Sequence, residues 1–333
     1  MYRIGITGVG GGVGQSIIKA LKHSDYEVIG MDGDDLGTGL YTVNKAYRIP
    51  YASHPNFINR LLEICADNKI DLLFPGLDAE LNILSKNSDL FKKIGTTVVV
   101  SSPDVIETAE NKFSTFKNLT ELGFNVPFTQ KATDLIVKLS YPFIIKPYLG
   151  GARSKDVFLV KNKEQYISVI ANIGNRINDF ILQEYLEGEE YTCGSVTLGG
   201  KCYGSIVMRR ELRSGDTYKC FSEENTIIQD YLINLMNALQ PFGACNAQLK
   251  LKDGVPYIFE INARCSGTTA ARALCGFNEP QMVSDFLLKS MEPKFKIESK
   301  TILRYWNEVS VQNESVDALR QTGFLEQNSE KKL

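Results

Sequence analysis

The chain has 333 residues, of which 43% are hydrophobic and 23% are charged, and its formal net charge is -2. This length supports two or three subdomains around a sizeable buried core, and the composition is ordinary for a globular protein. The near-neutral charge excludes a general attraction to nucleic acid or to acidic lipid. No apolar run approaches membrane-spanning length, and the first residues lead directly into a strand, without a signal-peptide pattern.

The seven cysteines are odd in number, widely spaced and free of CxxC or CxxH pairs. This pattern argues against a disulfide framework and against a zinc site, and it favours a reducing, cytoplasmic compartment. Cys265 is conceivable as a nucleophile, but His23 and His54 are the two histidines that could serve it as a base, and both lie far away in sequence. We therefore expect Cys265 to be a small residue in a pocket wall.

Residues 2–8 predict a buried strand that runs into the glycine-rich segment GVGGGVG, residues 8–14. A helix pattern follows, and then a second strand, Val28–Met31, which ends at Asp32. This order is the dinucleotide-binding fingerprint, with Asp32 on a ribose. The alternatives are a tight glycine turn without a ligand, or another anion at the helix start.

Strands and helices alternate as far as Pro103, which predicts a parallel sheet of about four strands. A loop rich in glycine and threonine follows the second of these strands. Asp78 and Glu80 come directly after the carboxyl end of a later strand, where ligands of such sheets bind. They are candidate substrate contacts, and the alternative is an exposed first turn of a helix.

The next part of the chain combines two lysines with a loop between strands. Lys112 opens a predicted helix, and Lys146 lies in the apolar strand YPFIIKP, Tyr141–Pro147. Residues 148–155 then link this strand to another. Such a flap can fold over phosphates and point backbone N–H groups and lysine charge at them. It is not a P-loop, because GxxxxGK[ST] is absent.

A strand-like run over Phe180–Leu186 precedes a β-hairpin. The segment Arg209–Lys219 is basic and reads as a loop, which either clamps an anionic substrate through Arg210 and Arg213 or is a solvated turn. The helix pattern over Asn225–Leu239 has an apolar stripe that we assign to the core.

Residues 246–268, NAQLKLKDGVPYIFEINARCSGT, predict a β-hairpin with an Asp-Gly turn. Glu260 and Asn262 lie two residues apart and therefore on one face of a strand. A strict two-residue turn places Gln248 on the opposite face, whereas a three-residue loop or a bulge brings Gln248 and Glu260 together. In that arrangement, oxygen ligands beside Arg264 suit Mg²⁺ carrying a polyphosphate. The alternative is a half-exposed hairpin with scattered polar residues.

Four separated stretches together resemble the ATP-grasp superfamily: Asn111-Lys112 opening a helix, PFIIKP, QEYLEGEEYT and QLKLKDGVPYIFEINARCSG. Their order and spacing match over residues 105–290, and the resemblance is to the carbamoyl-phosphate-synthetase large-chain-like group, as a single synthetase unit. It implies an ATP-grasp fold, α/β overall and α+β in the C-terminal part, behind a Rossmann-like parallel-sheet domain. The implied division is an N-terminal domain, a lid, a metal-binding subdomain and an extension, at 1–108, 109–186, 187–295 and 296–333.

The resemblance also implies roles for the matching residues. Those that would hold the nucleotide are Lys112, Lys146, Ser154, Lys155, Gln183, Glu184, Leu186 and Glu190. Gln248, Glu260 and Asn262 would be the ligands of two Mg²⁺ ions, although Gln248 stands where many members have glutamate. Arg264 and Lys146 would be catalytic, because they would neutralise the transferring phosphoryl group. The substrate candidates are Asp78, Glu80, Arg210, Arg213, Ser266, Gly267 and Thr268.

The implied reaction is ATP-dependent activation of a carboxylate as an acyl phosphate, which an amine then attacks, with no protein nucleophile. One alternative is a nicotinamide-dependent oxidoreductase built on GVGGGVG and Asp32, which leaves the hairpin unexplained. Another is a non-catalytic ATP-binding module, or a subunit that needs a partner. The expected partners are small carboxylates and amines rather than nucleic acid or membrane, and a homodimer is left open.

Overall fold

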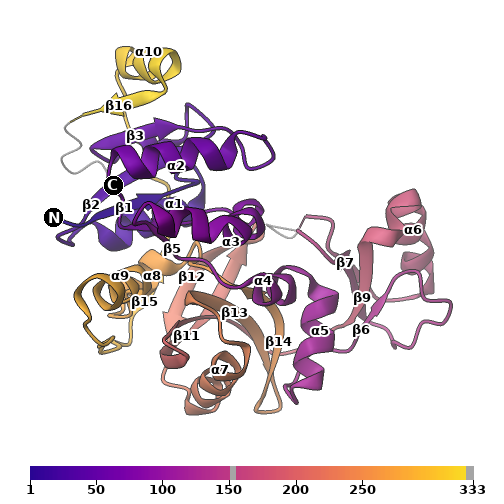
Figure 1. Cartoon of the computed structure of the whole chain (residues 1–333). Coiled ribbons are helices and arrows are strands. Elements are labelled where there is room, and N and C mark those ends of the chain that lie inside the picture. The colour runs from indigo at the N-terminus through magenta and orange to yellow at the C-terminus, as the bar shows by residue number, and fades with distance from the viewer. Residues whose placement is uncertain (151–154, 328–333) are drawn as a thin grey trace.

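The computed structural model describes residues 1–150 and 155–327, which form three β-sheets with helices packed against them (Figure 1). Ser154, predicted to contact the nucleotide, lies outside the described residues. No helix in these two ranges is both long enough and apolar enough to cross a membrane.

The N-terminal part is a six-stranded sheet in the order β16-β3-β2-β1-β4-β5. Its strands are β1 (Arg3–Ile6), β2 (Glu27–Asp32), β3 (Lys45–Arg48), β4 (Leu72–Phe74), β5 (Thr97–Val98) and β16 (Phe324–Glu326). The first five are parallel, as predicted, and β16 runs antiparallel to β3. The expected number of strands was too low, because β3 lies in the segment read as a loop and β16 arrives from the far end of the chain. Both depend on pairing partners that a local pattern does not reveal.

Helices cover both faces of this sheet. α1 (Gly12–Leu21) lies on the face that presents Ile4 and Ile6, while α2 (Phe57–Asp67) and α3 (Asp78–Lys93) lie on the opposite face. A short 3-10 helix, η1 (Thr38–Tyr41), lies between β2 and β3. Side chains that alternate along the strands thus fill two separate cores.

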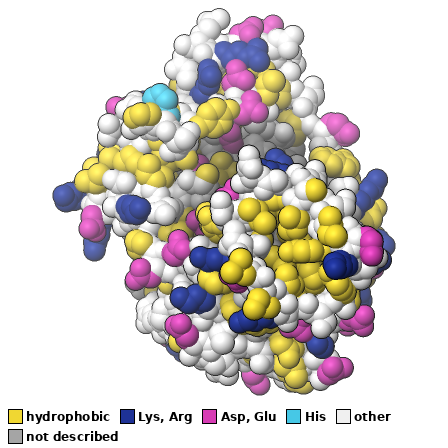
Figure 2. All heavy atoms as spheres, turned by 90° about the vertical axis from the view of Figure 1, so that its right-hand side faces the viewer, with side chains coloured by type: hydrophobic (Ala, Val, Ile, Leu, Met, Phe, Trp, Pro, Cys, Tyr) yellow, Lys and Arg dark blue, Asp and Glu magenta, His cyan; other side chains and the backbone are white. Residues whose placement is uncertain are grey.

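The middle of the chain forms a small four-stranded sheet in the order β6-β9-β7-β8, on the right in Figure 1. α4 (Pro103–Glu110) and α5 (Lys112–Glu121) lead into it. Its elements are β6 (Thr129–Lys131), β7 (Phe143–Pro147), β8 (Phe158–Val160), β9 (Phe180–Glu184), α6 (Lys163–Ile173) and η3 (Gly174–Asp179). Figure 2 shows apolar side chains gathered on the side of the molecule to which this sheet belongs, and its exposed apolar residues include Leu159 and Ile167.

The third sheet is antiparallel, in the order β14-β13-β10-β11-β12-β15. Its strands are β10 (Glu189–Leu198), β11 (Lys201–Arg213), β12 (Asp216–Ser222), β13 (Gly243–Lys252), β14 (Val255–Asn262) and β15 (Thr301–Leu303). α7 (Thr226–Leu239) covers one face, and its apolar stripe lies in the core as predicted. Part of the other face packs with α8 (Thr269–Leu274) and α9 (Glu279–Lys289) against the N-terminal sheet.

The prediction of a loop over Arg209–Lys219 was wrong. β11 continues to Arg213 and β12 begins at Asp216, joined by a turn in which Ser214 and Gly215 both have positive φ. A two-residue turn of this kind matches the twist of the flanking strands. The many charged side chains of this segment led to the prediction of a loop. Pairing with β10 and β12 nevertheless stabilises it as a strand.

Two short strands in the predicted extension, residues 296–333, pair with sheets formed by earlier parts of the chain. β15 pairs with β12 in the third sheet, and β16 pairs with β3 in the first. Between them lies α10 (Asn313–Thr322), which ends at Gly323 in the left-handed region. The domain boundaries at 108, 186 and 295 stay a prediction.

Candidate functional site: a cavity between two sheets

The β13–β14 hairpin combines a tight turn with a bulge. Its turn has two residues, Asp253 and Gly254, both with positive φ, so the three-residue loop, one of the two expected arrangements, does not occur in this hairpin. The register shifts at Gln248/Leu249, which makes Gln248 the direct partner of Glu260. The extra residue, Phe259, restores the parity that the short turn would have broken. The bulge therefore places Gln248 and Glu260 on the same face of the sheet, which was the second of the two expected arrangements.

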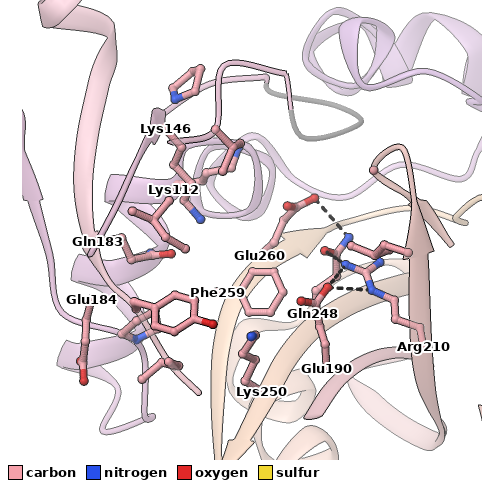
Figure 3. Close-up of a pocket in the computed structure, with 18 residues that line it drawn as sticks. Lys112, Lys146, Gln183, Glu184, Glu190, Arg210, Gln248, Lys250, Phe259 and Glu260 are labelled. Atoms are coloured by element: carbon pink, nitrogen blue, oxygen red, sulfur yellow. Dashed lines mark hydrogen bonds and ion pairs between the residues drawn. The ribbon is translucent and has the colours of Figure 1, made fainter. Parts of the chain in front are cut away.

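A cavity of about 300 Å³ lies between this hairpin and the four-stranded sheet. Figure 3 shows Lys112 and Lys146 on one side of it and Gln248, Glu190 and Arg210 on the other, with Glu260 between them. The other predicted residues that line it are Gln183, Glu184 and Leu186. The fold thus brings residues separated by up to about half of the chain to one cavity.

The two lysines are nearly enclosed. Lys146 is buried on β7 with its Nζ 5.7 Å from the centre of the Phe259 ring, and Lys112 Nζ donates to the Gly150 carbonyl at 2.7 Å. Burial, and then the charge of Lys112, lowers the pKa of Lys146 to about 7, although Glu260 and Glu190 oppose this. A pair of buried cations favours an anionic ligand, which would restore the charge balance.

The strand β9 and the segment after it supply the far wall of the cavity. The Gln183 side chain is buried and donates to Thr129 Oγ1 at 2.9 Å, while Tyr185 and Leu186 also line the cavity. Lys250, which the sequence did not single out, lines the same wall, and its Nζ lies 5.3 Å from the centre of the Tyr185 ring. A flat ligand here would meet backbone groups, an aromatic ring and apolar side chains.

Arg210 lines the cavity, but it lies on a strand rather than on the predicted loop, and its guanidinium contacts protein side chains. Its Nε and Nη2 donate to Glu190 Oε1 at 3.0 and 2.6 Å, and Nη2 also donates to Gln248 Oε1 at 2.7 Å. The predicted ribose-binding acid and a predicted metal ligand are therefore joined by one guanidinium (Figure 3). Arg213, by contrast, stacks its guanidinium over Tyr218 at 5.3 Å and does not line the cavity.

The donor set suits Mg²⁺ at Glu260 and Asn262. Glu260 Oε1 accepts long hydrogen bonds from the amides of Gln248 (3.3 Å) and Asn262 (3.2 Å), so one carboxylate is held among amide groups on one strand face. No cluster of three or more His, Cys, Asp or Glu side chains suited to a metal occurs in the described ranges. Mg²⁺ that keeps waters and binds substrate phosphates needs few protein ligands, so this set fits.

Arg264 lies at the next position along the same polar ribbon. Its Nε and Nη2 donate to the two carboxylate oxygens of Asp78 at 2.7 and 2.6 Å, and Nη2 approaches Asn262 Oδ1 at 3.3 Å. Burial lowers the pKa of Arg264, but the charge and hydrogen bond of Asp78 outweigh it and raise the pKa overall. Asp78 and Arg264 are 186 residues apart, and the fold pairs them in a two-pronged contact.

Several other residues predicted to contact the substrate are instead hydrogen-bonded to neighbouring parts of the protein. Glu80 is buried and accepts from Thr7 Oγ1 at 2.5 Å, and burial raises its pKa to about 7. It is neither a free ligand group nor the exposed helix turn of the alternative. Ser266 and Thr268 are buried and share a 2.8 Å hydrogen bond, and the Gly267 carbonyl accepts from Ser16 at 3.3 Å. This turn joins α8 to α1.

Lys155 also lies away from the main cavity. It lines a neighbouring hollow together with Tyr148, Asp156 and Arg176. Cys265 is buried, and burial raises the pKa of its thiol well above the usual range, which is unfavourable for a nucleophile.

The surroundings of Asp32 give no support to the dinucleotide interpretation of the N-terminal glycines. The Asp32 carboxylate accepts the backbone N–H groups of Gly10 (2.6 Å) and Asp34 (2.9 Å), so its hydrogen bonds go to its own chain rather than to a ribose. A side chain at Gly14 would collide with the Gly8 backbone. These glycines make a tight strand-to-helix turn, which was the alternative interpretation.

A buried ion pair beneath the cavity was missed altogether. Arg272 and Glu279 are both fully buried, and Arg272 Nη1 donates to Glu279 Oε1 at 2.6 Å. Arg272 Nη2 also donates to Asn246 Oδ1 and to Thr192 Oγ1. The sequence placed Arg272 on a short helix among alanines, which gave no sign of a partner. Another overlooked residue is Glu110, whose pKa burial and then Asp78 raise to about 7.

Two family profiles match the chain. The first, "PylC-like, N-terminal domain", matches residues 4–99, and the second, "ATP-grasp in the biosynthetic pathway with Ter operon", matches residues 176–309. The chain therefore contains an ATP-grasp domain and, before it, a PylC-like N-terminal domain.

The individual proteins that match the chain share about a quarter or less of their residues with it. The chain is 27% identical over 196 residues to the carbamoyl phosphate synthase large chain of Thermoanaerobacter sp. (strain X514), which covers 53% of this chain and 18% of that protein. It is 24% identical over 198 residues to D-alanine–D-alanine ligase A of Bacillus cereus, covering 54% and 59%. It therefore spans less than two thirds of either curated relative. Among solved structures, N5-carboxyaminoimidazole synthetase from Staphylococcus aureus in complex with ADP matches with a TM-score of 0.71 at 15% identity, over 96% of this chain and 85% of that one.

Proposed function

We propose that this protein is an ATP-dependent ligase that activates a carboxylate as an acyl phosphate for attack by an amine. The carrying observation is that Lys112 and Lys146 face Glu260 across one cavity, with Asn262 and Arg264 following Glu260 on the same ribbon. The two cations would hold a triphosphate from one side, and Mg²⁺ bound to the carboxylate and amide oxygens would hold it from the other. The relatives, carbamoyl phosphate synthase and D-alanine–D-alanine ligase, support this class of reaction.

Binding of the nucleotide comes first in this scheme. The triphosphate lies against the buried lysines, whose mutual repulsion it relieves, and the base lies against the wall formed by Gln183 to Leu186. Mg²⁺ at Glu260 and Asn262 would screen phosphate charge during transfer.

Arg264 orients the acid. Its planar fork holds the Asp78 carboxylate through two hydrogen bonds, and a substrate carboxylate that replaces Asp78 would take the same geometry. A substrate carboxylate oxygen then attacks the terminal phosphorus, the bond to ADP breaks, and the acyl phosphate forms. An amine attacks the acyl carbon and phosphate leaves. Glu110, which lies near enough to Asp78 and Arg264 for their charges to act on its carboxyl, is our candidate to accept the proton that the amine loses.

The test is phosphate release from Mg-ATP across a panel of paired carboxylic acids and amines. We expect release only with a matching pair, and Glu260→Ala should lower it by roughly 100-fold to 1000-fold, since transition-state charge stabilisation of this kind is worth that much. Glu223→Ala is the matched control, because that carboxylate pairs with Arg209 away from the cavity. Nucleotide binding without release for any pair would instead indicate a non-catalytic ATP-binding module.

The substrates are thus small molecules, and their identities follow from that panel. A homodimer stays a prediction, which light scattering of the purified chain would decide. A fully active Glu260→Ala protein would contradict the proposed site.

A further inference from the structure

Gln248, Glu190 and Arg210 form a closed polar assembly on the cavity wall. The Gln248 side chain uses Oε1 to accept from Arg210 at 2.7 Å and Nε2 to donate to Glu260 at 3.3 Å. Its oxygen, the atom that a metal would need, thus faces a guanidinium. The Arg210 side chain is 10% exposed and ion-paired with Glu190 at 2.6 Å, so its position is fixed by the protein.

A metal ion beside a fixed guanidinium is unfavourable, because like charges at short distance in a partly buried site repel strongly. Gln248 also contributes no negative charge to offset that repulsion. Glu260 differs from Gln248 because it brings a negative charge, and its carboxylate accepts from the Asn262 amide at 3.2 Å. Asn262 Oδ1 also accepts from a guanidinium, that of Arg264, but at 3.3 Å, and Arg264 is held by both carboxylate oxygens of Asp78. The carboxylate end of the hairpin therefore suits a divalent cation better than the Gln248 end, whose oxygen accepts from Arg210 at 2.7 Å.

Charge counting gives the same answer. Consider the same wall with a glutamate at position 248 and no arginine at position 210. The carboxylate would add one negative charge, and loss of the guanidinium would remove one positive charge. That difference of about two charges equals the charge of one Mg²⁺ ion, so the arginine and the amide together perform the neutralisation that a second ion would perform.

We propose that Arg210 takes the place of one of the two Mg²⁺ ions that the family resemblance implies, so that nucleotide binds with a single divalent cation at Glu260 and Asn262. This inference rests on the proposed function, since it presupposes nucleotide in the cavity. It corrects the role predicted for Gln248, which becomes a bridge between Arg210 and Glu260 instead of a metal ligand.

The experiment counts bound metal directly. Equal concentrations of chain and a non-hydrolysable ATP analogue, adenylyl imidodiphosphate, are titrated with Mn²⁺, and the free ion is followed by its electron paramagnetic resonance signal. We expect one Mn²⁺ per wild-type chain. The double variant R210M/Q248E removes the guanidinium and adds a carboxylate, and it should bind two.

Arg209→Met is the matched control. Arg209 is the neighbour of Arg210 on β11, but its side chain pairs with Glu223 at 2.8 Å and stacks on Phe221, so it points to the other face. This variant should bind one Mn²⁺, like the wild type. Circular dichroism checks that the double variant is folded, and the wild-type count stands by itself if it is not.

Two Mn²⁺ per wild-type chain would overturn the inference while leaving the proposed ligase function intact. One Mn²⁺ in both the wild type and the folded double variant would also overturn it, because Arg210 would then not be what excludes the second ion. Failure of the wild type to bind the nucleotide analogue in calorimetry would overturn the proposed function and this inference together. One ion in the wild type and two in the double variant would support it.

Discussion

Two arginine assemblies lie on the same face of the third sheet and differ in what surrounds them. Each joins an arginine to a glutamate and to an amide of β13: Arg272 with Glu279 and Asn246, and Arg210 with Glu190 and Gln248. The side chains of the first ion pair are 0% exposed, whereas those of the second are 10% and 24% exposed and line the cavity.

The comparison shows that chemistry alone does not mark a functional site. Beneath the cavity, α8 and α9 close over Arg272, and the space above Gly194 is filled by the ion pair itself. Arg210, in contrast, lines the cavity, so a ligand there can reach its guanidinium. The same set of groups is structural where packing encloses it and available for binding where packing leaves a space.

The largest expected effect is on the enclosed pair. Arg272→Met leaves Glu279 buried without a cation, which should lower the free energy of unfolding by about 3–5 kcal/mol. Urea denaturation measures this. The double variant R272M/E279L should recover most of the loss, because it removes both charges. If Arg272→Met alone unfolds at the wild-type urea concentration, the pair is not structural and the contrast fails.

Gly194→Ala tests how tightly the enclosed pair is packed. An added Cβ would lie 2.6 Å from Arg272 Nη1 and would also meet Glu279, so the pair would have to shift. We expect a loss of about 1–3 kcal/mol in the free energy of unfolding, the usual range for overpacking. Gly267→Ala is the control, since its Cβ would meet nothing within 4 Å. Equal stability of the two variants would show that the enclosed site has room.

The open site should respond to pH through Lys146. Its pKa in the free protein is about 7, and bound phosphate would raise it, so nucleotide binding takes up a proton at pH values between the two pKa values. Affinity should therefore fall about tenfold per pH unit above pH 7, as a one-proton linkage requires. Calorimetry in buffers of different ionisation enthalpy measures both the affinity and the proton uptake. A flat profile from pH 7 to 9 would contradict the shifted pKa.

The smallest expected effect is on the stability of the open pair. Arg210→Met removes an ion pair that solvent reaches, and such pairs contribute about 0–1 kcal/mol. Thermal unfolding should shift by only a few degrees at most, in contrast to Arg272→Met. A loss comparable to that of Arg272→Met would mean that the two assemblies are equivalent.

Much of the site could be predicted from the sequence because its signals are local. The apolar strand before Lys146, the asparagine that begins α5 before Lys112, and the two-residue spacing of Glu260 and Asn262 each depend on neighbours in the chain. Strand periodicity and helix capping are short-range effects, so they can be recognised from the order of neighbouring residues. The parallel N-terminal sheet was predictable for the same reason.

Tertiary structure decided what the local pattern left open. Parity along the hairpin gave two answers for Gln248, and pairing of β13 with β14 selected the bulge at Phe259. The contacts of Arg210, Arg272 and Asp78, and the return of β16 to the first sheet, join segments far apart in sequence. Such contacts depend on which surfaces pack together, and packing is a property of the whole fold rather than of any stretch of it.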